Sequence, residues 1–147
     1  MRRALHICAA VLLLGAVCPA AQPRGSDAGA GPAQTGAPSM SDYVGTWSGS
    51  WEGGGTGGFV LTLEMAEGSK LGGRVSVTGE PTYDATLKTV AFEGKKMTAT
   101  YDFPPDPQIG IVLVATFEGS SANGTWSARQ NGATTDVASG TWTVKKK

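Results

Sequence analysis

Residues 59–65 have the sequence FVLTLEM, with a large apolar side chain at every second position. Successive side chains of a β-strand point to opposite faces, so this period of two predicts a strand with one buried face. The same alternation recurs over residues 43–51, 71–78 and 97–103. After residue 21, no segment has apolar residues at the i, i+3, i+4, i+7 spacing of an amphipathic helix. The pattern therefore predicts an all-β fold.

Glycine-rich turns separate the alternating runs, and Asn131-Gly132 is a strong hairpin signal because both residues tolerate a positive φ. In the fourth run, Leu87 and Val90 are out of phase, which predicts a β-bulge. Eight strands are expected, over residues 43–51, 59–65, 71–78, 85–92, 97–103, 109–118, 123–129 and 137–144.

The short connections predict that successive strands are hairpin neighbours. Short antiparallel strands must protect their edges, and closing the sheet into a barrel removes those edges. We therefore expect an eight-stranded antiparallel up-and-down β-barrel. A β-sandwich is the alternative.

The first 21 residues have the pattern of a signal peptide. A short cationic start with Arg2 and Arg3 precedes an apolar run over residues 7–17, which is too short to span a bilayer. Small residues then allow cleavage after Ala20 or Ala21. A rival hypothesis is lipoprotein processing, with a lipid anchor on Cys18. Either reading predicts an extracytoplasmic protein, secreted or periplasmic, with no transmembrane span.

Residues 22–41 consist largely of Ala, Gly, Pro, Ser and Gln. Such a composition offers little apolar surface to bury and predicts a disordered linker. The expected domain organisation is a signal peptide over 1–21, this linker over 22–41 and a β-barrel over 42–147.

Composition excludes several classes of function. The 147 residues include 12 Lys and Arg against 12 Asp and Glu, whereas a general nucleic-acid binder needs a basic face. The single histidine, His6, and both cysteines, Cys8 and Cys18, lie in the predicted leader. The exported chain then lacks the usual catalytic base and the usual zinc ligands. We expect no enzyme activity, no metal site and no cofactor.

Aromatic side chains are the remaining candidates for a site. Trp51, Tyr101 and Trp126 fall on the predicted inward face, together with several glycines and alanines. Large rings beside small residues predict a pocket in the barrel mouth for a small apolar or aromatic ligand. The alternative is that the rings fill the interior. The domain would then be a protein–protein interaction module of the cell envelope, or a protease-inhibitor-like domain with an extracytoplasmic protein partner.

The segment Tyr43-Val44-Gly45-Thr46-Trp47 resembles the aromatic-x-Gly-x-Trp opening of the calycins. This superfamily joins lipocalins, fatty-acid-binding proteins, avidins and periplasmic metalloprotease inhibitors. The resemblance implies that Gly45, Trp47 and Trp142 belong to a plug at one barrel end. It also implies that a cation after Trp142, here Lys145, packs across the plug. Biotin-contacting residues of the avidins and the inhibitors' disulfide have no counterpart in this sequence.

Overall fold

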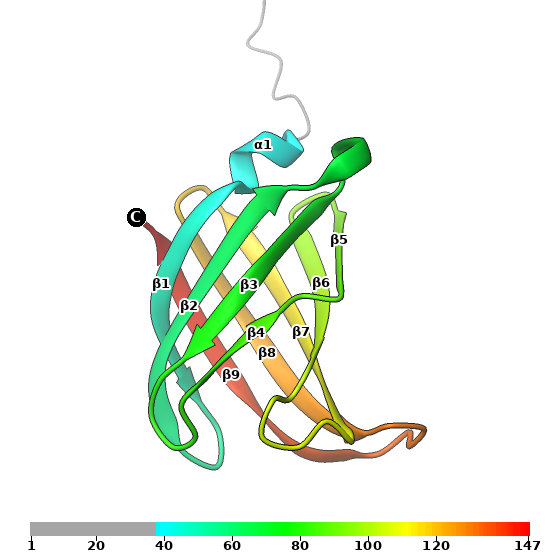
Figure 1. Ribbon diagram of the computed structural model, residues 1–147. Coiled ribbons are helices and arrows are strands. Elements are labelled where there is room, and N and C mark those ends of the chain that lie inside the picture. Colours follow the sequence, from blue (N-terminus) through cyan, green and yellow to red (C-terminus); the bar gives the residue numbers. More distant parts are fainter. Residues whose placement is uncertain (1–37) are drawn as a thin grey trace, which may run out of the picture. The chain divides into compact units, whose positions relative to one another are not determined.

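The computed structural model describes residues 38–147, which form one antiparallel sheet of nine strands (Figure 1). The all-β prediction is confirmed. The strands are β1 (Gly45–Glu52), β2 (Thr56–Met65), β3 (Leu71–Val77), β4 (Tyr83–Thr86), β5 (Thr89–Glu93), β6 (Lys96–Asp102), β7 (Ile109–Glu118), β8 (Ser121–Gln130) and β9 (Asp136–Lys146).

The strand order is β4-β3-β2-β1-β9-β8-β7-β6-β5. Consecutive strands are neighbours in the sheet, with the exception of β4 and β5, which form its two edges. In addition, β1 pairs with β9 and so joins the two ends of the domain. The sheet curls into an open, barrel-like shape rather than splitting into the two stacked sheets of a sandwich (Figure 1). The hairpin expected at Asn131-Gly132 joins β8 to β9.

The expected fourth strand, over residues 85–92, is in fact two strands. β4 pairs with β3, whereas β5 pairs with β6 at the other edge of the sheet. Between them, the Leu87 amide donates to the Gly73 carbonyl at 2.9 Å and the Lys88 amide donates to the Thr100 carbonyl at 2.7 Å. The chain therefore changes partners at this point. The phase slip near Leu87 marks that crossing rather than a bulge within a single strand.

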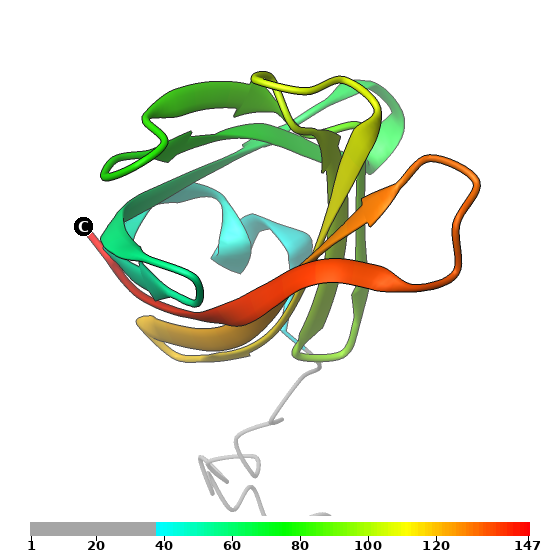
Figure 2. The same ribbon diagram turned by 90° about the horizontal axis from the view of Figure 1, so that it is seen from below.

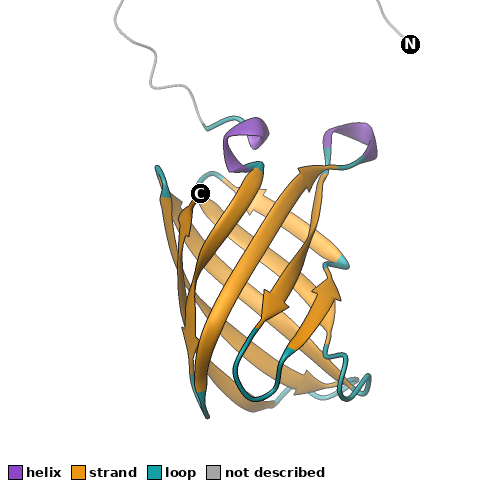
Figure 3. Cartoon of the chain, turned by 60° about the vertical axis from the view of Figure 1, so that its left-hand side comes forward, coloured by secondary structure: helices purple, strands orange, loops and turns teal. Residues whose placement is uncertain are grey.

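Two short helical segments were not expected from the sequence (Figure 3): α1 (Met40–Tyr43) and the 3₁₀ turn η1 (Glu67–Ser69). Ser39 precedes α1, and its amide donates to the Asp42 carboxylate at 2.8 Å. Four residues are too few to display a period of 3.6, which is why the pattern was invisible. Neither helical segment in residues 38–147 is long and apolar enough to cross a membrane.

Met40 and Ser41, which fall within the predicted linker, belong to α1. The predicted signal peptide, the candidate lipidation residue Cys18 and residues 22–37 of the predicted linker lie outside the described residues.

The end of the sheet beside α1 is packed with aromatic rings. Tyr43 stacks on Phe92 with ring centroids 4.1 Å apart, and its hydroxyl donates to the Gly94 carbonyl at 3.0 Å. Phe117 packs edge-on against both Tyr43 and Trp47, at 5.3 and 4.8 Å. Figure 2 shows α1 within the outline of the curled sheet at this far end. This end of the domain is therefore filled.

Candidate functional site

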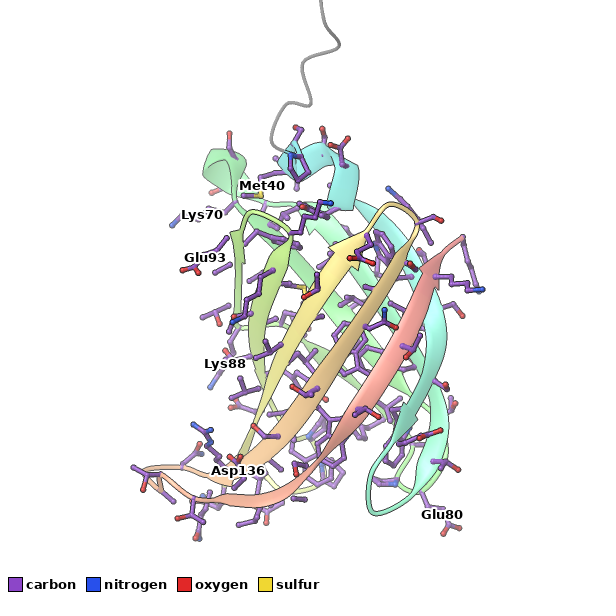
Figure 4. All side chains as sticks on the ribbon, turned by 180° about the vertical axis from the view of Figure 1, so that it is seen from behind. Met40, Lys70, Glu80, Lys88, Glu93 and Asp136 are labelled. Atoms are coloured by element: carbon purple, nitrogen blue, oxygen red, sulfur yellow. The ribbon has the colours of Figure 1, made fainter. Side chains whose placement is uncertain are left out.

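An apolar cavity of about 250 Å³ lies at the end of the sheet opposite α1. Its rim includes Gly53 and Gly54 of the β1–β2 loop and Glu80 and Pro81 of the β3–β4 loop. Figure 4 shows Glu80 at one end of the sheet and Met40 of α1 at the other. The inner wall comes from alternating inward positions on several strands: Phe59, Tyr101, Ile111, Leu113, Trp126 and Ala128.

The three predicted ligand-binding residues, Trp51, Tyr101 and Trp126, all line this one cavity. Trp51 and Trp126 pack edge to face with ring centroids 6.0 Å apart. Their indole Nε1 groups donate to the backbone carbonyls of Thr78 and Glu52, at 3.1 and 3.0 Å. Because these donors are already paired, the two indoles offer the cavity apolar ring surface.

The tripeptide Gly-Thr-Trp occurs at residues 45–47, 124–126 and 140–142, and the last two repeats explain how these rings are placed. β8 and β9 pair so that Gly124 lies opposite Trp142 and Trp126 lies opposite Gly140. A Cβ atom on Gly140 would lie 2.6 Å from the Trp126 Nε1 atom, and one on Gly124 would lie 2.9 Å from the Trp142 ring. Each glycine therefore makes room for the tryptophan of the other repeat.

This reciprocal pairing was not predicted from the sequence. The two repeats are symmetric about residue 133, which is the middle of the five-residue loop 131–135 between β8 and β9. A two-residue turn at Asn131-Gly132 would instead have paired Trp126 with Val137, so the length of the loop and the register shift between Ala128 and Arg129 decide the match of each Gly with the Trp of the other repeat.

Tyr83 was not predicted, yet it supplies half of the cavity's hydroxyl pair. It lies at the start of β4, and its hydroxyl is 3.0 Å from the hydroxyl of Tyr101 on β6. Its ring also packs edge-on against Phe103 at 5.2 Å. Burial raises the pKa of Tyr101 strongly and also raises the pKa of Tyr83. Both phenols therefore stay protonated at neutral pH.

Charge is nearly absent from the cavity. Among the described lining residues, Glu80 alone is charged, and it is exposed at the rim. Within residues 38–147, no three His, Cys, Asp or Glu side chains gather where they could hold a metal ion. The cavity can bind by apolar contact and through two phenols.

The predicted plug residues divide between two levels of the sheet. Trp47 is fully buried beside α1, and its Nε1 atom donates to the Tyr43 carbonyl at 3.0 Å. Gly45 begins β1 with φ +131°, where a side chain would be strained. Trp142, however, pairs with Trp51 and packs against Phe59 at 5.0 Å, so it lies nearer the cavity end.

The cation over Trp47 is Lys146, not the expected Lys145. The Lys146 Nζ atom is 5.4 Å from the ring centroid and donates to the Asp42 carbonyl at 2.7 Å. Alternation along β9 explains the correction. Trp142 and Lys146 share one face, whereas Lys145 is exposed on the other.

Comparison of the chain with protein-family models, curated proteins and solved structures found no significant match. The geometry of the cavity is therefore the basis for assigning a function.

Proposed function

We propose that this protein is a non-enzymatic binding protein that holds a small apolar or aromatic molecule in the mouth of its barrel-like sheet. The observation that carries this proposal is that Trp51, Tyr101 and Trp126 together line one apolar cavity. A barrel filled by its own aromatic side chains would leave no such space. The cavity thus favours ligand binding over an interaction module with a filled interior.

The cavity volume limits the size of the ligand. A dry apolar cavity of about 150 Å³ accommodates benzene. By proportion, about 250 Å³ corresponds to a ligand on the order of ten non-hydrogen atoms. We therefore expect molecules with one ring, or two fused rings, rather than long lipids.

The lining residues support binding rather than catalysis. Those that titrate are Glu80 at the rim and the two phenols, Tyr83 and Tyr101. A covalent mechanism needs a nucleophile with a base in hydrogen-bonding reach. The tyrosine pair has raised pKa values and only another phenol beside it, so neither phenol is activated as a nucleophile.

We further propose that the fold is a calycin-like barrel, closed where the chain crosses between β4 and β5. The hydrogen bonds of Leu87 to Gly73 and of Lys88 to Thr100 support this, because they tie the crossing segment to both β3 and β6. The leader-like residues 1–21 support export to an extracytoplasmic compartment.

The binding proposal can be tested by NMR titration of the ¹⁵N-labelled protein with cumene and naphthalene. The chain has four tryptophans, and each contributes one indole N–H signal. We expect the signals of Trp51 and Trp126 to shift with saturation, while those of Trp47 and Trp142 stay nearly constant, because only the first pair lines the cavity.

A variant that fills the cavity tests whether the ligand binds inside it. Ala128→Phe places a ring in the cavity and should abolish the shifts, because Ala128 is a buried lining residue. Thr125→Phe is the matched control, since Thr125 is exposed on the same strand and does not line the cavity. Equal shifts at all four indoles, or none at any, would contradict the proposal.

A further inference from the structure

We propose that the cavity selects neutral ligands that carry one hydrogen-bond acceptor, and that this acceptor binds the spare hydroxyl hydrogen of the Tyr83–Tyr101 pair. This inference rests on the proposed binding function and adds a chemical class to it. A ketone, an aldehyde or an ether on a small apolar frame has the required chemistry.

The two phenols have one more hydrogen to donate than their mutual hydrogen bond uses. Each phenol has one hydrogen to donate, and the two oxygens are 3.0 Å apart. Their mutual bond uses one of the two hydrogens. Among the hydrogen bonds of residues 38–147, neither hydroxyl has another protein partner. One phenolic hydrogen therefore remains to be donated.

Both tyrosines lie in the wall of the cavity, where a bound ligand can reach their hydroxyls. Tyr101 is only 3% exposed, Tyr83 is partly buried, and both line the cavity. The indole donors of Trp51 and Trp126 are paired to backbone carbonyls. Among the described lining residues, the phenol pair is consequently the one side-chain donor still available. A ligand that displaces water without accepting this hydrogen leaves a buried donor unpaired, which lowers its affinity.

The electrostatic environment of the cavity favours a neutral ligand. No Lys, Arg or His is among the described residues that line the cavity, and the carboxylate of Glu80 is at the rim. An anionic ligand would lose its hydration without gaining a countercharge. Burial also keeps the Tyr101 phenol protonated by raising its pKa, so it remains a donor well above neutral pH. A neutral acceptor fits this environment better than a carboxylate.

Acetophenone, cumene and benzoate separate these effects, because they have the same number of non-hydrogen atoms on the same ring. Their dissociation constants would be measured from the Trp51 and Trp126 indole shifts. We expect acetophenone to bind about five- to tenfold more tightly than cumene, the range typical of one net hydrogen bond. Benzoate should bind at least about tenfold more weakly than acetophenone.

Hydroxyl deletions then test the anchor. Tyr101→Phe or Tyr83→Phe alone leaves one phenol whose single hydrogen is no longer shared, so each single variant should still prefer acetophenone to cumene. The double variant Tyr83→Phe/Tyr101→Phe should remove the advantage of acetophenone while leaving cumene within about twofold, because both rings stay in place. Retained cumene binding also shows that the double variant is folded. Tyr43→Phe is the matched control, since it deletes a hydroxyl bonded to Gly94 at the filled end. It should leave all three affinities unchanged.

Each outcome has a distinct meaning. If no neutral probe shifts the two indoles, the proposed binding function fails. If cumene equals acetophenone, or if acetophenone keeps its advantage in the double variant Tyr83→Phe/Tyr101→Phe, binding stands but the hydroxyl anchor is wrong. If benzoate binds most tightly, the preference for neutral ligands is overturned.

Discussion

Replacing Trp47 by alanine should be the most damaging single truncation in the domain. The ring is 0% exposed, packs against Phe117 at 4.8 Å, and donates to the Tyr43 carbonyl at 3.0 Å. Truncation of a buried Trp costs about 3–5 kcal/mol. Leaving the Tyr43 carbonyl unpaired adds about 1 kcal/mol. The free energy of unfolding should therefore fall by about 4–6 kcal/mol, out of the roughly 5–15 kcal/mol typical of a native domain.

Trp51 is the matched comparison, because it lies four residues further along the same face of β1. One side of its ring borders the cavity, so it has fewer packing partners to lose. We expect Trp51→Ala to lower the free energy of unfolding by about 2–3 kcal/mol. It should also weaken probe binding, which Trp47 substitutions should not.

Urea denaturation followed by circular dichroism measures both losses. With a slope of about 1.5 kcal/mol per molar urea, Trp47→Ala should lower the midpoint by about 3–4 M. Trp47→Phe keeps the transition measurable if the alanine variant is already unfolded, and should cost about 2 kcal/mol. A loss below about 1.5 kcal/mol for Trp47→Ala, or equal losses at Trp47 and Trp51, would refute the reasoning.

Three further predictions concern other contacts. Lys146→Ala should lower the free energy of unfolding by about 0.5–1 kcal/mol through loss of the cation–π contact with Trp47, whereas Lys145→Ala should stay within about 0.5 kcal/mol in the same urea assay. Gly140→Ala should lower the free energy of unfolding by about 1–3 kcal/mol, because its methyl would lie 1.9 Å from the Glu52 carbonyl oxygen. It should also weaken cumene binding, because the same methyl would lie 2.6 Å from the Nε1 atom of Trp126, which lines the cavity. Gly72→Ala is the control for both measurements, since its added methyl would have its nearest neighbour at 3.5 Å. The raised pKa of Tyr101 means that the native state holds this proton when the unfolded chain has lost it, so stability is fully present below the ordinary value of 10.0 and falls as the pH rises above it. Urea midpoints on both sides of that pH should show a decline of at most about 1.4 kcal/mol per pH unit from this group, and Tyr101→Phe should make the decline shallower.

The inward face of the sheet could be predicted from the sequence because alternation is a local property. Trp51, Tyr101 and Trp126 occupy inward positions of their own strands, whatever the partners of those strands. Their meeting in one cavity followed once the strands formed a curled sheet. The same alternation, applied from Trp142 along β9, would have selected Lys146 rather than Lys145 as the cation facing Trp47.

By itself, then, the sequence determined the all-β class, the inward residues and most of the turns, since these depend on neighbours within a few positions. The tertiary structure alone decided which edge each half of the fourth strand joins, because that choice depends on the distant partners Gly73 and Thr100. It also decided that Trp142 lies level with Trp51, through the pairing of β1 with β9. The Tyr83–Tyr101 contact has the same origin. Its two residues lie on strands that pair with different neighbours, β4 with β3 and β6 with β5 and β7, so only the curl of the sheet brings their hydroxyls together.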